Sequence, residues 1–265
     1  MGLLNDSLKR TIERVFYMNR LELKRPLVIA HRGASAYAPE NTLYAFQLAI
    51  EMQADTIELD VHPSKDGKLI VIHDDTIGRL SEGSGLVKDY TLEELRKYHF
   101  NNGIEKYADA RIATLDEVYD LFAGNDMLIN VEIKNPDDAF LQEVAACTAR
   151  HKIQERIIYS SFYHRALTRM QELESNAFVA PLYDGNLVKP WQYAASFGAR
   201  ALHTSCSDLY LFPDYTKRAH ELGIRVHPWT VNGREGTLDM LKRGVDGVIT
   251  DFPDVARSCI LELEN

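Results

Sequence analysis

Short runs of β-branched and aliphatic residues alternate with segments of helical periodicity along most of this 265-residue chain. In one such segment Ala45, Leu48, Ala49 and Met52 would share one face of a helix. Strands that alternate with helices are typical of βαβ units and a parallel sheet. The strand-like runs are Leu27–Ala30, Thr56–Val61, Met127–Ile133, Arg156–Ser160, Ala177–Leu182, Ala199–Thr204, Ile224–Thr230 and Gly247–Thr250.

About eight such units without a glycine-rich nucleotide loop favour a closed barrel over a doubly wound sheet. The chain length agrees, because a (β/α)8 barrel takes about 250 residues. The predicted fold class is therefore α/β, a TIM (β/α)8 barrel spanning residues 25–265.

Residues 75–111 interrupt the alternation. A stretch containing glycine and serine is followed by a short helical segment, where the spacing of Thr91 and Glu94 predicts a capping box. We interpret this interval as a small insertion in the barrel, after a strand that ends at His73.

Residues 1–24 precede the first strand and have apolar side chains at helical spacing: Leu4, Leu8, Ile12, Val15 and Phe16. We expect an N-terminal helical extension that packs on the barrel. A weak contact of this helix with a membrane surface is the alternative.

Charge and composition narrow the choice of partners. The formal net charge of -9 disfavours a nucleic-acid surface, although it leaves room for a local basic pocket that binds one phosphate. No run of 18 apolar residues is present, so no transmembrane segment is predicted. The three cysteines are an odd, widely spaced set, and Cys206 and Cys259 fall in or near apolar runs, which favours buried thiols over disulfides or zinc ligands. Together with the lack of a secretory signal, they favour a cytoplasmic location. The sequence makes no prediction of oligomeric state.

Strand parity separates acidic from apolar residues in two of the runs, because alternate side chains of a strand point to opposite faces. Glu58 and Asp60 share one face of their strand, and Glu132 and Lys134 share one face of another. A parallel strand covered on both faces should be apolar almost throughout. Acidic residues near the carboxyl ends of two strands therefore indicate an active site, since TIM barrels carry theirs at that end.

Glu58, Asp60 and Glu132 would form an all-oxygen cluster, which suits Mg²⁺ or Ca²⁺ better than zinc. Three confined carboxylates would raise one another's pKa, and one bound divalent cation is the simplest resolution. Such a cation would hold a phosphate oxygen and stabilise developing charge. A salt-bridged cluster with nearby arginine and lysine is the competing explanation.

His31 and His73 both follow strand-like runs directly. Cleavage of a phosphodiester requires a base and an acid, and histidines with near-neutral pKa values suit both roles. Arg32 and Lys134 are candidates for phosphate binding. Trp229 would line an apolar wall for the substrate or belong to the core.

Several motifs occur in an order and spacing that resemble the glycerophosphodiester phosphodiesterase family from about Leu27 to Pro253. They are His31-Arg32-Gly33, Pro39-Glu40-Asn41-Thr42, Glu58-Leu59-Asp60, Asp66-Gly67, His73-Asp74, Val131-Glu132-Ile133-Lys134, Trp229-Thr230-Val231-Asn232 and Gly247-Val248-Ile249-Thr250-Asp251.

The resemblance implies a TIM barrel with a small insertion after the second strand. It implies metal-dependent hydrolysis of glycerophosphodiesters, which are deacylated phospholipids, to sn-glycerol 3-phosphate and an alcohol. The implied roles are an acid–base pair of His31 and His73, phosphate contacts from Arg32 and Lys134, and a glycerol-side wall from Trp229. The implied ligands of one Mg²⁺ or Ca²⁺ ion are Glu58, Asp60 and Glu132.

Two alternatives remain at this level. The first keeps the chemistry but assigns a bulkier lipid substrate such as a lysophospholipid, because aromatic residues stand near strand ends at Phe162, Tyr163 and Tyr183. The second is a non-catalytic phosphate-binding module, because a fold alone does not prove activity. The complete set of predicted acid–base and metal-binding residues argues against the second alternative.

Overall fold

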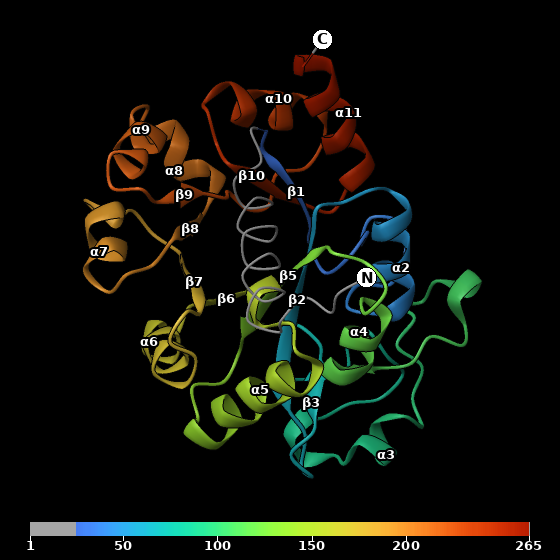
Figure 1. Cartoon of the computed structure of the whole chain (residues 1–265). Helices are drawn as coiled ribbons and strands as arrows, with labels where there is room; N and C mark the ends of the chain where they lie inside the picture. Colours follow the sequence, from blue (N-terminus) through green and yellow to red (C-terminus); the bar gives the residue numbers. More distant parts are fainter. Residues whose placement is uncertain (1–24, 265) are drawn as a thin grey trace, which may run out of the picture.

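Parallel strands pair in sequence order in the computed structural model, which describes residues 25–264. Helices surround the strands (Figure 1). The parallel strands of this described region are β1 (Leu27–Ala30), β2 (Thr56–Pro63), β5 (Leu128–Ile133), β6 (Ile157–Ser161), β7 (Phe178–Tyr183), β8 (Ala201–Thr204), β9 (Arg225–Val226) and β10 (Gly247–Thr250).

The sheet closes on itself. β10 pairs with β1 in parallel register, and the two lie side by side in Figure 1. On its other edge, β10 meets the segment that follows β9, where the Ile249 amide donates to the Pro228 carbonyl at 3.0 Å. The predicted TIM barrel is confirmed.

The helices connect successive strands or extend the turns between them. They are α2 (Leu43–Glu51), α3 (Leu92–Leu95), α4 (Leu115–Leu121), α5 (Asp138–His151), α6 (His164–Leu173), α7 (Pro190–Ser196), α8 (Cys206–Leu211), α9 (Tyr215–His220), α10 (Arg234–Lys242) and α11 (Pro253–Glu264). Short 3-10 turns form η1 (Val87–Asp89), η2 (Glu105–Tyr107) and η3 (Gln154–Arg156).

The strand predicted at Ile224–Thr230 is shorter than expected, because β9 covers only Arg225–Val226. Pro228 lacks an amide hydrogen and cannot donate toward β10. The pairing with β8 continues on both sides of it, where the His227 amide donates to the Leu202 carbonyl and the Trp229 amide donates to the Thr204 carbonyl, each at 2.9 Å. The chain therefore keeps its course along the barrel despite the short assigned strand.

Residues 75–111 connect two short strands that extend the sheet in antiparallel orientation. β3 (Leu69–Val71) pairs antiparallel with β2, and β4 (Ala113–Thr114) pairs antiparallel with β3. Between β3 and β4 lie η1, α3 and η2, and the predicted capping box of Thr91 and Glu94 is present. This segment has a small core of its own, formed by Ile70, Ile72, Ile77, Leu80, Val87, Leu95, Phe100 and Ile112.

The barrel interior is apolar at one end and polar at the other. Leu27, Leu128 and Ile158 belong to a buried apolar cluster at the amino ends of their strands. Two residues further along β5 and β6, on the same faces, stand Asn130 and Ser160. The polar layer thus gathers toward the carboxyl ends. The apolar residues of opposite parity belong to the larger core shared with the helices, as Ile57, Leu59 and Val61 do.

The N-terminal helix predicted in residues 1–24 lies outside the described residues, and the division of the chain into domains stays a prediction. Among residues 25–264, no helix is long and apolar enough to cross a membrane. Cys147 and Cys259 are buried and Cys206 is partly buried. The expectation of a buried thiol therefore holds fully for Cys259 and only partly for Cys206.

We expect Asp55→Asn to lower the free energy of unfolding by about 3–5 kcal/mol at neutral pH, in the range for breaking a buried ion pair. The Asp55 carboxylate accepts from Arg25 at 2.8 and 2.9 Å, from Arg257 at 2.8 Å, and from the Val28 amide at 2.9 Å. It thereby ties β1 to α11. Asp214→Asn, which breaks an exposed pair with Arg218, should cost much less in the same denaturant titration.

The loss should also depend on pH. Burial opposes the charge of Asp55, but Arg25, the Val28 amide and Arg257 outweigh it and lower the pKa of Asp55. The stabilisation is therefore complete above the unfolded pKa of about 3.9 and is lost as the pH falls through the folded pKa. A gap between the wild type and Asp55→Asn that stays constant into acid would contradict this.

Candidate active site

The turn after β1 carries the first motif. His31 and Arg32 follow the strand directly, and Arg32 and Gly33 have positive φ angles of 56° and 83°. A Cβ atom on Gly33 would stand 2.6 Å from the backbone of Ala45 in α2, so only glycine fits this close approach. The tight turn aims the Arg32 amide at the Glu58 carboxylate, to which it donates at 3.0 Å.

The predicted acidic cluster forms from neighbouring strands. Pairing of β2 with β5 sets Asp60 opposite Glu132 and Glu58 opposite Asn130. Carboxylate oxygens of Glu58, Asp60 and Glu132 all lie within 4.8 Å of one another, and the three residues are buried. The structure therefore brings together the three residues that the sequence assigned to a metal.

Charge is not balanced within this cluster. Burial, followed by repulsion from Asp60, raises the pKa of Glu58 and of Glu132. Burial also opposes the charge of Asp60, but Lys134 and Arg32 outweigh it, and the pKa of Asp60 is lowered. The cluster favours a further cation over three uncompensated charges.

Both predicted phosphate-binding residues pair with the carboxylates in this structure. Lys134 Nζ lies 2.5 Å from a Glu132 oxygen and 3.0 Å from an Asp60 oxygen. Arg32 donates to Glu40 at 2.8 Å and has its Nε 3.5 Å from Asp60. The salt bridges foreseen as a competing explanation are thus present. They provide only two cationic side chains for three carboxylates, and one of the two, Arg32, is shared with Glu40.

The residues fit a hard cation. Oxygen is the donor at every one of the three positions, as Mg²⁺ and Ca²⁺ prefer. Glu58 Oε1 is buried and makes no hydrogen bond to any described residue, an arrangement that costs free energy unless a cation or water compensates it. Glu58, Asp60 and Glu132 are the residues that would hold such an ion.

Residues of the motif Pro39-Glu40-Asn41-Thr42 contact the cluster and its arginine partner. The Asn41 amide donates to Asp60 at 2.8 Å, and Glu40 pairs with both Arg32 and Arg79. Thr42 is the N-cap of α2. Asn41 and Glu40 were missed as site residues, although they stand in one of the motifs. Their contacts with residues far along the chain could not be read from the order of residues.

Carboxylates orient both predicted acid–base histidines. His31 Nδ1 lies 2.6 Å from Asp251 Oδ1, and His73 Nδ1 lies 2.7 Å from Asp74 Oδ1. Asp251 follows β10 directly, next to β1 in the closed barrel. Because the carboxylates occupy the Nδ1 atoms, Nε2 is the nitrogen of each ring that can face a substrate. Burial lowers the pKa of His73 despite the opposing effect of Asp60.

A cavity of about 170 Å³ is lined by every predicted site residue except Asp60. Trp229 forms part of its wall and packs edge-on against Phe162, with ring centroids 5.9 Å apart. The Trp229 indole donates to the His203 carbonyl at 3.0 Å, which fixes its ring. Predicted site residues in the lining are His31, Arg32, Glu58, His73, Glu132, Lys134 and Trp229.

A second cavity of about 460 Å³ shares Glu132, Lys134 and Phe162 with the first. Its outer wall includes Leu86 and Val87, from the segment between β3 and β4, and also includes Tyr163. The cluster therefore adjoins a second cavity, whose volume is large enough for a group larger than glycerol.

The remaining histidines near the barrel interior serve its framework. His62 Nε2 donates to the His73 carbonyl at 3.0 Å. His203 and His227 bond to each other at 3.1 Å, and burial lowers the pKa of His203 to about 3. A neutral imidazole of this kind is unsuited to take up a proton near neutral pH.

Comparison with known proteins agrees with this site. The model of the Glycerophosphoryl diester phosphodiesterase family matches residues 31–255. A glycerophosphodiester phosphodiesterase of Caldanaerobacter subterraneus subsp. tengcongensis is 41% identical over 236 residues, which span 87% of this chain and 96% of the relative. One from Bacillus subtilis is 32% identical, spanning 89% of this chain and 87% of its own.

Solved structures are similar as well. An Oleispira antarctica phosphodiesterase in complex with the product sn-glycerol-3-phosphate is 27% identical, with a TM-score of 0.81 over 91% of this chain and 98% of the other. A glycerophosphodiester phosphodiesterase of Thermotoga maritima is 31% identical, with a TM-score of 0.71 over 90% and 98%.

The barrel and its pocket, taken with these relatives, define a phosphoric diester hydrolase. The resemblance seen in the motifs is confirmed. The chain belongs to the glycerophosphoryl diester phosphodiesterase family.

Proposed function

We propose that this protein is a metal-dependent glycerophosphodiester phosphodiesterase that hydrolyses glycerophosphodiesters to sn-glycerol 3-phosphate and an alcohol. One observation carries the proposal. Two carboxylates of the buried cluster of three, two histidines oriented by carboxylates and two cationic side chains line one cavity of about 170 Å³. A cavity of this size suits a small molecule. The cytoplasmic location stays a prediction.

Arg32 and Lys134 would bind the phosphate of the substrate. The two side chains already lie beside the Asp60 carboxylate, and the oxygens of an incoming phosphate are negatively charged as well. Arginine presents its donors as a planar fork and lysine acts as a point charge. A divalent cation bound by Glu58, Asp60 and Glu132 would supply Lewis-acid stabilisation of charge on the phosphate oxygens.

His31 and His73 would move the protons. One ring would take a proton at Nε2 from the attacking group, whether water or a glycerol hydroxyl, and the other would give a proton to the leaving oxygen. Asp251 and Asp74 hold the Nδ1 sides of the rings, which fixes the tautomer and the ring orientation. Trp229 and Phe162 would exclude water from one side of the substrate.

The test begins with purified protein stripped of metal by a chelator and incubated with glycerophosphoethanolamine. We expect release of glycerol 3-phosphate to return when Mg²⁺ or Ca²⁺ is added back. Release at full rate without added metal, after removal of the chelator, would contradict metal dependence. No release of glycerol 3-phosphate with either ion would contradict the proposed reaction on this substrate.

A lysophospholipid substrate is the second candidate, and the outer cavity favours it. Leu86, Val87, Phe162 and Tyr163 give that cavity an apolar side next to the acidic cluster, where an acyl chain would lie. A direct competition between glycerophosphoethanolamine and a lysophosphatidylethanolamine decides between the candidates. Faster turnover of the water-soluble diester would count against the lipid.

We expect Asp251→Asn to lower kcat by roughly 10²- to 10⁴-fold with little change in KM, because an asparagine can stabilise the wrong tautomer of His31. Ser35→Ala is the matched control, since Ser35 donates to the same Asp251 oxygen at 3.0 Å without touching the ring. If Asp251 acts through His31, adding Asp251→Asn to His31→Ala should cause almost no further loss. Additive losses in that double variant would contradict the positioning role.

A further inference from the structure

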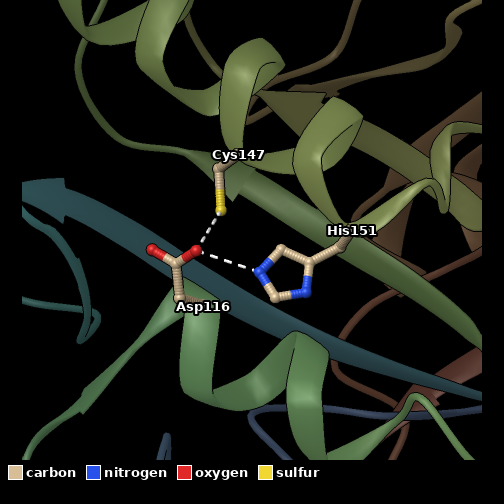
Figure 2. Close-up of side chains that lie close together, drawn as sticks. All are labelled: Asp116, Cys147 and His151. Carbon is tan, nitrogen blue, oxygen red and sulfur yellow. Dashed lines mark hydrogen bonds and ion pairs between the residues drawn. The ribbon is translucent and has the colours of Figure 1, made fainter.

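A second cluster of metal-ligating side chains lies outside the barrel, between α4 and α5. Figure 2 shows Asp116 of α4 pointing toward Cys147 and His151 of α5. One ligand atom from each residue lies within 4.8 Å of the other two. Because α5 runs from the carboxyl end of β5 back toward the amino end of β6, its last turn lies away from the catalytic cavity.

We propose that Asp116, Cys147 and His151 form a binding site for one zinc-type divalent cation. The site is separate from the catalytic cluster and does not depend on the proposed function. Sulfur, imidazole nitrogen and carboxylate oxygen form a mixed donor set of the kind that binds zinc. Mg²⁺ and Ca²⁺ prefer oxygen alone, so the two clusters of this protein should select different ions.

The spacing of the donor atoms fits the ion. Asp116 Oδ1 lies 3.4 Å from Cys147 Sγ and 2.9 Å from His151 Nε2. Zinc bonds of about 2.0–2.3 Å in a tetrahedron place neighbouring ligand atoms roughly 3.3–3.7 Å apart. Cys147 and His151 are four residues apart, and so they share one face of α5. Small side-chain shifts would therefore complete three bonds, and the fourth position would be open to water.

The far side of the His151 ring provides an independent observation. Its Nδ1 lies 3.5 Å from Asp120 Oδ1, while Nε2 faces Asp116. Histidines that ligate metals characteristically donate their other ring nitrogen to a carboxylate, which fixes the tautomer. The Tyr119 ring packs against the imidazole with centroids 5.3 Å apart. Nε2 is thus already directed at Asp116.

Charge and protons balance when the ion binds. Cys147 is fully buried and donates its thiol hydrogen to Asp116 in the metal-free protein. Formation of the sulfur–metal bond releases that proton to solvent. The hydrogen on His151 Nε2 that faces Asp116 must also leave, so that the ring binds the ion as the neutral tautomer with its hydrogen on Nδ1, toward Asp120. One thiolate and one carboxylate then compensate a divalent cation. Arg150, which contacts Asp116 at 3.3 Å, has a second partner in Glu143 at 3.0 Å and can remain paired.

Cobalt is a suitable probe, because a cobalt–thiolate bond gives a charge-transfer absorption that oxygen ligands do not give. The protein is stripped of metal, saturated with Mg²⁺, and titrated with Co²⁺ and then with Zn²⁺ in competition. We expect one thiolate-bound Co²⁺ per chain, displaced by Zn²⁺. Absence of the charge-transfer band at excess Co²⁺ would overturn the proposal.

Variants assign the band. Cys147→Ala should abolish it, whereas Cys259→Ala, which removes another buried thiol, should leave it intact. His151→Gln alters a partly exposed side chain and decides the question even if Cys147→Ala fails to fold. In this variant the Co²⁺ affinity, measured by titration of the band, should fall at least tenfold. Asp120→Asn should weaken binding by about 10-fold, as loss of an outer partner does. A band that survives unchanged in His151→Gln and Cys147→Ala would overturn the assignment.

Discussion

Replacing His31 or His73 with alanine should lower the kcat for glycerophosphodiester hydrolysis by about 10²- to 10⁴-fold, the usual contribution of a general acid or base. Each ring is held at Nδ1 by a carboxylate, at 2.6 Å for His31 and 2.7 Å for His73. An imidazole fixed in this way is positioned for proton transfer at its other nitrogen. Steady-state kinetics at saturating Mg²⁺ measure the loss for each variant.

The acid–base role makes two further demands on these variants. Calorimetric titration should give nearly unchanged metal affinity, since neither histidine belongs to the carboxylate cluster. His62→Gln is the matched control. His62 lies in the same region and contacts the His73 backbone, but it has no proposed role in proton transfer. Wild-type turnover in either His31→Ala or His73→Ala, or an equal loss in His62→Gln, would refute the assignment.

Local patterns in the sequence were enough to predict the barrel and to bring its acidic residues together. The period of two in β2 and β5 separates Glu58 and Glu132 from the apolar residues around them, and parallel pairing of these strands then places the acids side by side. The closed barrel was predicted from the count of about eight alternating units without a glycine-rich nucleotide loop. These features depend on spacing within a segment, which a single sequence displays directly.

Residues that depend on contacts between distant segments could not be predicted in the same way. Asp251 reaches His31 only because closure of the barrel sets β10 beside β1. Asn41 reaches Asp60 across the turn that precedes α2. The Asp116, Cys147 and His151 cluster arises from the packing of α4 against α5, and its spacing in the sequence resembles no simple metal-binding motif. Cys147 is buried, and its neighbours give it a potential role as a ligand.

Pairing of charges within the acidic cluster was foreseen only as a competing explanation, and it coexists with the features of a metal site. Lys134 links Asp60 and Glu132, whereas Glu58 Oε1 makes no hydrogen bond to a described residue. The three carboxylates therefore differ in what they contribute. Asp60 is compensated by cations of the protein itself, and Glu58 is the carboxylate with most to gain from an added ion.

That difference predicts opposite effects on metal affinity and on stability. Glu58→Gln should weaken Mg²⁺ or Ca²⁺ binding by more than the roughly 10- to 100-fold typical of losing an outer partner. The free energy of unfolding without metal should stay within about 1 kcal/mol of the wild type or rise, because a neutral side chain avoids the cost of a buried charge. A glutamine also keeps an oxygen for the Arg32 amide, which now donates to Glu58 at 3.0 Å.

Glu40→Gln is the matched counterpart. Glu40 forms ion pairs with Arg32 and Arg79, and it does not belong to the cluster of Glu58, Asp60 and Glu132. It should lower the free energy of unfolding by about 1–3 kcal/mol, as loss of a charged hydrogen-bond acceptor does, while metal affinity changes little. Calorimetric titration and denaturant unfolding of both metal-stripped variants measure the two quantities separately. If Glu58→Gln bound metal as the wild type does, Glu58 would be part of a salt-bridged framework, and the ion would have to lie elsewhere.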